Sequence, residues 1–166
     1  MMFSKNEKIL VTGASGLIGA NLLTSLKNSG YEVIGLDSKN DLRVSSNAFK
    51  IFNDFKPSIV FHLAAKVGGI HANANFKADF YSDNVLINTN VVNACIKNNV
   101  EYIFAMGTGC AYPKRLENQI LSEKDFLDGI PEVTNDAYAY AKRGLLVHLK
   151  SLEESKLIKY TYCLPA

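Results

Sequence analysis

A tyrosine and a lysine stand four residues apart in the segment Tyr138-Ala-Tyr-Ala-Lys142. On a helix this spacing places both side chains on one face. A nearby ammonium favours the tyrosinate, so we expect Lys142 to lower the pKa of the Tyr138 phenol. A phenol tuned in this way can exchange a proton with a carbonyl or an alcohol while a hydride moves to or from a nicotinamide. Tyr140 lacks such a partner, because Gly144 occupies the position four residues on.

A glycine-rich loop near the amino terminus could hold the phosphates of a nicotinamide cofactor. In Thr12-Gly-Ala-Ser-Gly-Leu-Ile-Gly19 the glycines let the backbone turn tightly and approach a pyrophosphate closely. A helix that follows would point its free N–H groups at those phosphates. The alternative is a strand–helix turn that merely tolerates glycine. The loop predicts the following cofactor-binding residues: Gly13, Ser15, Gly16, Leu17, Ile18 and Gly19.

Asp37 ends the next apolar run, where a carboxylate would accept hydrogen bonds from the adenosine ribose hydroxyls. Such a carboxylate would repel a 2′-phosphate and so favour NAD over NADP. Lys39 and Arg43 lie near enough in the sequence to offset this effect, and a solvated strand-end aspartate is the alternative. A third apolar run leads to further predicted cofactor contacts on the nicotinamide side: Leu63, Ala64 and Ala65. Lys142 is also predicted to contact the cofactor.

Short apolar runs alternate with helical patterns along the chain. The runs 8–12, 31–36, 58–63, 102–106 and 159–164 predict strands, and the patterns 20–28, 48–55, 78–98 and 138–154 predict helices. On the helix 78–98 the predicted apolar side comprises Val85, Leu86, Val91, Val92 and Cys95. Residues 112–135 hold two prolines and no sustained period, so we expect an ordered loop there. The alternation predicts an α/β fold, a Rossmann-type doubly wound parallel sheet with helices on both faces.

Composition excludes several classes of protein. The 166 residues are 48% hydrophobic and 20% charged, the balance of an ordinary globular protein. The formal net charge of +2 is too small to predict binding to nucleic acid or to a membrane surface, and no apolar run approaches the roughly 18 residues that span a bilayer. The three scattered cysteines favour a reducing cytoplasm over a disulfide framework, and they predict no metal site.

Several longer segments resemble the GDP-L-fucose synthase family, within the extended branch of the short-chain dehydrogenases/reductases. They are Phe61-His-Leu-Ala-Ala-Lys-Val-Gly-Gly-Ile70, Gly107-Thr-Gly-Cys-Ala-Tyr-Pro-Lys114 and Pro131-Glu-Val-Thr-Asn-Asp-Ala-Tyr-Ala-Tyr-Ala-Lys142. The resemblance implies a two-stage reaction on GDP-4-keto-6-deoxymannose. Protons at C3 and C5 are first exchanged, and hydride from NADP(H) then reduces C4. NAD(H) is the alternative cofactor that Asp37 allows.

The resemblance also implies roles for individual residues. Tyr138 would donate the proton to the C4 oxygen, and Cys110 would be an acid/base in the epimerisation, although a small buried cysteine is the alternative. Thr108 stands where the family usually has serine, and its hydroxyl would bind the substrate oxygen. Asp41 and Leu42 would lie beside the adenine. Family members pair through the helices that correspond to 78–98 and 138–154, so we expect a homodimer. Four residues are candidates for its interface, although some of them must serve the core: Ile87, Val91, Leu145 and Leu149.

The family runs to about twice the length of this chain. We therefore expect residues 1–166 to be the NAD(P)-binding Rossmann domain, with the GDP-sugar domain and the histidine partner of Cys110 absent from this chain. On that interpretation the chain alone would be inactive. Two alternatives remain: an epimerase/reductase of another GDP-sugar such as a heptose, or a truncated, non-catalytic dinucleotide-binding protein.

Overall fold

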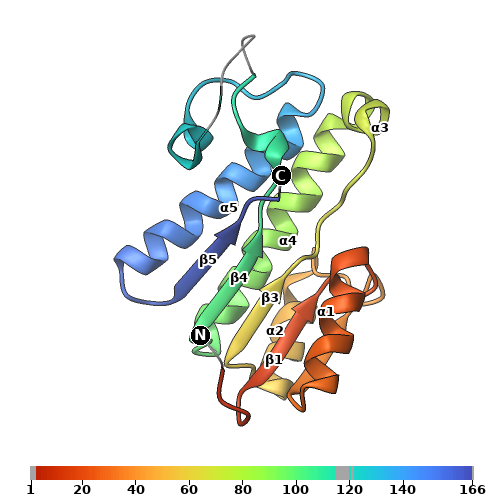
Figure 1. Ribbon diagram of the computed structural model, residues 1–166. Coiled ribbons are helices and arrows are strands. Elements are labelled where there is room, and N and C mark those ends of the chain that lie inside the picture. Colours follow the sequence, from red (N-terminus) through yellow and green to blue (C-terminus); the bar gives the residue numbers. More distant parts are fainter. Residues whose placement is uncertain (1–2, 115–119, 121, 166) are drawn as a thin grey trace.

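The computed structural model describes residues 3–114, 120 and 122–165 of the chain (Figure 1). Five parallel strands form one sheet in the order β2-β1-β3-β4-β5. Their bounds are β1 Lys8–Thr12, β2 Glu32–Leu36, β3 Ile59–His62, β4 Tyr102–Met106 and β5 Lys159–Cys163. The chain runs from β1 to β2 at one edge and then returns past β1 to add β3, β4 and β5 in the opposite direction, which confirms the Rossmann-type fold.

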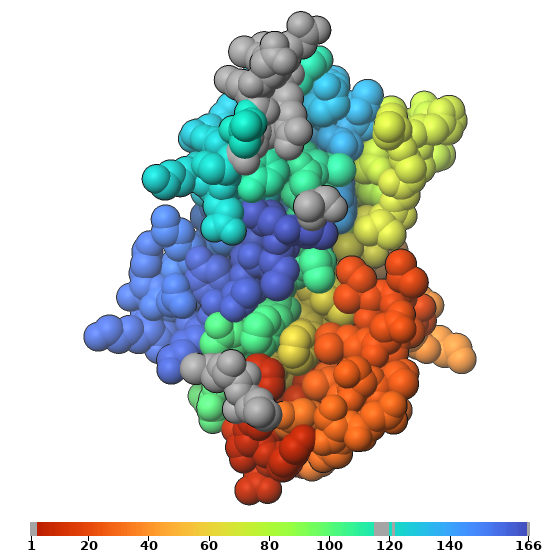
Figure 2. Space-filling model, viewed as in Figure 1, coloured from red at the N-terminus to blue at the C-terminus, as the bar shows by residue number. Residues whose placement is uncertain are grey.

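The helices cover both faces of this sheet (Figure 1). On one face, α1 (Leu17–Asn28) packs against β1 through Leu22, Leu23 and Leu26. The other face carries the larger core, formed with α2 (Ser45–Phe55), α4 (Lys77–Lys97) and α5 (Asp136–Glu154). Side chains from β3 and β4 are visible at the surface between α1 and the carboxyl-terminal segment (Figure 2).

Two parts of the fold differ from the sequence prediction. A six-residue helix, α3 (Ile70–Asn75), precedes α4, where no helical period had indicated one. Within the predicted loop 112–135, a short 3-10 helix spans Glu123–Leu127, and Pro113 and Pro131 form an isolated antiparallel bridge. Positions 115–119 and 121 of this loop lie outside the described residues.

The predicted apolar side of α4 is only partly correct. Val91, Val92 and Cys95 are fully buried, whereas Leu86 is 46% exposed. Three asparagines are buried instead, because two loops and α5 supply backbone acceptors for their amides: Asn84, Asn88 and Asn90. Of the four candidate interface residues, Val91, Leu145 and Leu149 are the ones that serve the core, since all three belong to the larger core.

The remaining structural predictions concern membranes, metals and disulfides. No helix in the described part of the chain combines the length and the apolar character needed to cross a membrane. Among the same residues, no group of three or more His, Cys, Asp or Glu side chains could hold a metal ion. All three cysteines are free, and Cys95 lies in the core as expected.

Candidate functional site

The glycine loop turns sharply between β1 and α1. Gly13 adopts a φ of 69°, in the left-handed region that favours glycine, and a Cβ there would lie 2.8 Å from the Ala64 nitrogen. A Cβ on Gly19 would lie 2.2 Å from the Gly13 oxygen. These two glycines therefore let the loop close tightly on itself and on the end of β3.

Gly16 is the glycine that leaves space for a ligand. A Cβ added there would meet only the Gly13 oxygen, at 3.3 Å, and the residue lines a cavity. Gly16 is also the N-cap of α1, and no side chain caps this helix end. The first-turn N–H groups of α1 thus have no side-chain acceptor, which is the arrangement that binds phosphate at a helix N-terminus.

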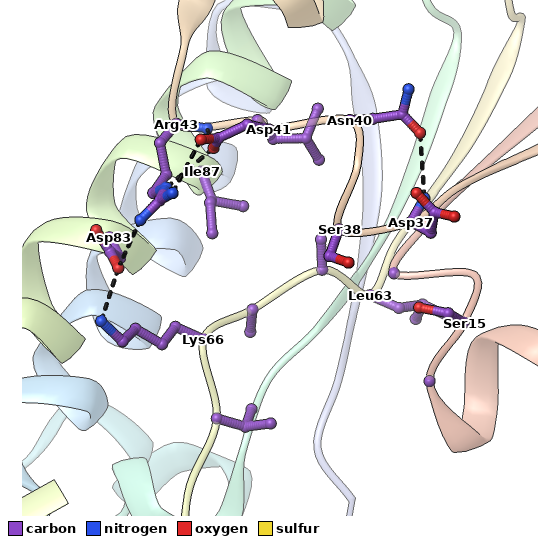
Figure 3. Close-up of a pocket in the computed structure, with 16 residues that line it drawn as sticks. Ser15, Asp37, Ser38, Asn40, Asp41, Arg43, Leu63, Lys66, Asp83 and Ile87 are labelled. Carbon is purple, nitrogen blue, oxygen red and sulfur yellow. Dashed lines mark hydrogen bonds and ion pairs between the residues drawn. The ribbon is translucent and has the colours of Figure 1, made fainter. Parts of the chain in front are cut away.

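The cavity beside this loop has a volume of about 500 Å³, in the range of small-molecule sites (Figure 3). Its walls come from the carboxyl ends of β1, β2 and β3 and from one side of α4. Nine residues that the sequence predicted to bind cofactor line it: Gly13, Ser15, Gly16, Asp37, Asp41, Leu42, Leu63, Ala64 and Ala65.

The other predicted cofactor residues do not line this cavity. Leu17 and Ile18, in the first turn of α1, are 85% and 50% exposed. Gly19 is buried within the turn itself. Lys142 is buried on α5, with only 1% of its surface exposed.

Two of the buried asparagines of α4 hold the cavity walls. Asn84 exchanges two hydrogen bonds of 2.9 Å with the backbone of Lys66, which follows β3. Asn90 donates to the carbonyl oxygens of Leu42 and Arg43, both at 2.9 Å, after β2. Sequence reasoning overlooked these residues, because asparagine on a helix usually indicates a solvated face.

His62 joins the glycine loop to α4. Its Nδ1 lies 2.9 Å from Thr12 Oγ1, and its Nε2 lies 3.0 Å from Asn88 Oδ1. Thr12 Oγ1 also accepts hydrogen bonds from the backbone nitrogens of Leu63 and Ala64. Because the Thr12 oxygen already accepts two bonds, its hydroxyl proton is directed at Nδ1, and Nε2 carries the imidazole proton. Burial and the nearby Lys142 charge lower the pKa of His62 to about 3, so the ring is neutral.

The four predicted catalytic residues meet at the carboxyl end of β4. Lys142 Nζ donates to the Met106 oxygen at 2.8 Å and lies 5.9 Å from the centre of the Tyr138 ring. Thr108 follows β4 and accepts a hydrogen bond from the Cys110 nitrogen at 3.2 Å. Cys110 is exposed and close enough to Tyr138 to affect its ionisation. The predicted constellation is thus assembled, from α5 and from the loop after β4.

The expected lowering of the Tyr138 pKa is wrong for this structure. Burial of the phenol, followed by the nearby Cys110 sulfur, raises the pKa of Tyr138 to about 12. The pKa of Lys142 is lowered to about 8 because its ammonium is buried. Tyr138 is therefore a protonated phenol at neutral pH. The main cause is desolvation, which sequence spacing cannot report.

Arg143, next to Lys142, is a further buried residue that the sequence did not indicate. Its guanidinium donates to the backbone oxygens of Ala111, Gly129 and Asp128 at 2.7–3.0 Å. These bonds tie the loops around Cys110 to α5. An arginine in a sequence carries no signal that it will bind three carbonyl groups.

The model of the NAD dependent epimerase/dehydratase family matches residues 9–165. The chain belongs to this family.

Curated relatives match 81% to 98% of the chain. GDP-L-colitose synthase of Yersinia pseudotuberculosis is 38% identical over 136 residues, which are 81% of this chain and 44% of that protein. GDP-L-fucose synthase of Dictyostelium discoideum is 33% identical over 166 residues, 98% of this chain and 52% of that protein. The chain spans about half the length of the curated relatives it matches.

A solved structure repeats the fold. The GDP-L-fucose synthetase of Naegleria fowleri, solved with NADP bound, superimposes with a TM-score of 0.84 and 33% identity. The alignment covers 99% of this chain and 52% of that protein. The sheet and helices described above are thus those of an epimerase/dehydratase domain.

The residues present fit the dinucleotide that the family name implies. The open space at Gly16 and the uncapped start of α1 suit a pyrophosphate. One oxygen of the Asp37 carboxylate accepts the Lys39 nitrogen at 2.8 Å, and the structure gives the other oxygen no hydrogen bond from the described residues. That second oxygen could accept ribose hydroxyls.

Proposed function

We propose that this chain is the dinucleotide-binding part of a GDP-sugar epimerase/reductase that uses NAD(P)H. The finer proposal is a GDP-L-fucose synthase type of reaction, which acts on GDP-4-keto-6-deoxymannose. Support comes from the relatives and from the four side chains at the end of β4. Because the chain spans half of those relatives, we propose that the sugar-binding part lies outside it and that residues 1–166 alone turn over no substrate.

The observation that carries this proposal is the meeting of two sites at one edge of the sheet. Lys142 reaches the last residue of β4 with a 2.8 Å hydrogen bond, and the glycine loop follows β1 at the same edge. Parallel strands bring their carboxyl ends together, and ligands of such sheets bind there. A cofactor held by the loop would therefore extend toward Tyr138.

The residues of this chain divide the acid–base work between them. When bound, NAD(P)H supplies the hydride that reduces C4. Tyr138, protonated at neutral pH, donates its proton to the oxygen that becomes the alcohol. Because Thr108 Oγ1 already accepts the Cys110 nitrogen, its own proton is left to donate to the same oxygen. The two donors would also stabilise the enolate formed while Cys110 exchanges protons beside the ketone.

A tyrosine pair on α5 gives a matched test. In the protein that contains this chain, Tyr138→Phe should lower ketone reduction by about 10²–10⁴-fold, the usual contribution of one acid–base group, with dinucleotide affinity unchanged. Tyr140→Phe is the control, because Tyr140 is exposed two residues away on the same helix. Both are followed by nicotinamide absorbance with GDP-4-keto-6-deoxymannose. Full turnover by Tyr138→Phe would refute the proton-donor role, and turnover of a GDP-heptose alone would select the other substrate.

We also propose a homodimer and a cytoplasmic location. Three free cysteines support a reducing compartment. For the dimer, α4 and α5 lie side by side on one face of the sheet and keep exposed apolar side chains, including Leu86 and Val147. Leu86 and Val147 therefore take the place of the buried residues Val91, Leu145 and Leu149 as proposed interface residues.

A further inference from the structure

We propose that this chain prefers NAD(H) to NADP(H), and that Asp37 and the ion pairs around Arg43 set that preference. The proposal rests on the dinucleotide binding proposed above and specifies its cofactor. It sets the chain apart from the Naegleria fowleri relative, whose structure holds NADP.

Asp37 presents a carboxylate to the adenosine end of the cavity. It follows β2 and lines the cavity together with Ser15 and Ser38 (Figure 3). Its Oδ1 is fixed by the Lys39 nitrogen at 2.8 Å, and its own backbone nitrogen donates to Asn40 Oδ1 at 3.3 Å. The turn thus fixes the orientation of the carboxylate. A 2′-phosphate at this position would face a like charge, whereas a 2′-hydroxyl would donate a hydrogen bond.

Arg43 is a cation in the cavity wall that could bind a 2′-phosphate, but ion pairs with Asp41 and Asp83 already hold its guanidinium. Its Nε and Nη2 donate to the two oxygens of Asp41, both at 2.9 Å, and its Nη1 donates to Asp83 at 3.2 Å. The guanidinium lowers the pKa of Asp41, as expected for a tight pair. Its backbone is held as well, because the Arg43 oxygen accepts Asn90. Arg43 consequently points toward α4 and away from Asp37 (Figure 3).

The other cation of the cavity is paired in the same network. Lys66 Nζ lies 2.8 Å from Asp83 Oδ2, the oxygen that also accepts Arg43. Three carboxylates and two cations line the cavity: Asp37, Asp41, Asp83, Arg43 and Lys66. The cavity wall therefore carries a net negative charge. A dianionic 2′-phosphate would have to break these ion pairs to gain Arg43 or Lys66 as a partner.

Calorimetric titration of the chain with NADH and with NADPH tests the proposal. We expect NADH to bind at least about tenfold more tightly, since one like-charge contact exceeds that factor. Asp37→Asn, which keeps the acceptor for Lys39, should reduce this ratio at least about fivefold, which is most of a tenfold preference. Asp41→Asn combined with Asp83→Asn frees Arg43 and should tighten NADPH binding.

The matched control is Asp54→Asn, which changes net charge by the same amount on the exposed side of α2. It should leave the NADH to NADPH ratio unchanged. Tighter binding of NADPH by the unaltered chain, or the same ratio in Asp37→Asn and Asp54→Asn, would overturn the cofactor preference while the proposed function stands. If neither dinucleotide binds, the proposed function falls as well.

Discussion

The three glycines of the β1–α1 turn look equivalent in the sequence, but they have different surroundings. Side chains at Gly13 and Gly19 would collide with backbone atoms at 2.8 and 2.2 Å, so these glycines are required by the fold. Gly16 has a φ of −74°, which any residue can adopt, and open space beyond the Gly13 oxygen. If a ligand approaches the loop, Gly16 is where a side chain would obstruct it.

Gly16→Val separates folding from binding. We expect dinucleotide affinity to fall at least about tenfold, because the side chain would occupy the phosphate position, while the unfolding midpoint changes little. Calorimetry and urea denaturation measure the two quantities. Gly144→Ala is the control, since nothing lies within 4 Å of that position and helix propensity should add about 0.5–1 kcal/mol of stability. Unchanged affinity in Gly16→Val would remove the phosphate-loop assignment.

At the residue scale, the spacing of residues in the motifs predicted which side chains come together, but it did not predict the pKa of Tyr138. The sequence identified Tyr138, Lys142, Thr108 and Cys110, and the fold brings them together at the end of β4. The direction of the Tyr138 pKa was wrong, because it depends on how deeply the phenol is buried. Motif spacing reports which side chains can meet, whereas burial depends on every segment that packs around them.

Among the elements, α4 acts as the support for the site. Its buried asparagines bind the loop after β2, the loop after β3, His62 and α5. The spacing of apolar residues predicted this helix at 78–98, within one residue of its observed bounds. It could not identify a face on which amides are buried, because each amide has hydrogen-bond partners on other elements, far away in the chain. The short helix α3 was overlooked for a related reason, since its six residues lack an apolar period.

The neutral His62 between β3 and α4 predicts an acid-sensitive fold. The unfolded histidine binds a proton near its ordinary pKa of 6.5, whereas the buried ring does so only near 3. Stability is therefore complete above pH 6.5 and is lost as the pH falls toward 3. At pH 5 the loss from this group should be about 2 kcal/mol, at 1.36 kcal/mol for each pH unit.

Urea denaturation at pH 7 and pH 5 measures that loss, and His62→Asn should remove most of it. His71→Asn is the control, because His71 is exposed at the start of α3. The window from pH 5 to 6.5 lies above the range where the carboxylates of Asp41 and Asp83 titrate, since ion pairing lowers both pKa values. An equal pH dependence in His62→Asn and the unaltered chain would show that another group is responsible.

At the scale of the whole molecule, the proposed dimer depends on the outer faces of α4 and α5. Both helices lie on the same side of the sheet and contact each other, and their inward residues Val91, Leu145 and Leu149 fill the core. The outward faces retain Leu86, 46% exposed, and Val147, 50% exposed. A two-fold axis beside this helix pair would bury both residues in both subunits. Each substitution would therefore change two side chains in the interface.

Leu86→Lys combined with Val147→Lys should convert the dimer to a monomer. Burying one such side chain contributes about 1.5–3 kcal/mol, so two buried leucines and two buried valines account for well over a hundredfold in the dimer dissociation constant. Sedimentation velocity at micromolar concentration measures the change. Ile70→Lys is the control, because Ile70 is also an exposed apolar residue but lies on α3, away from these faces. A monomeric unaltered chain would contradict self-association through this chain alone. A dimer that tolerates both lysines would move the interface elsewhere, because two ammonium groups cannot be buried there without opposing charges.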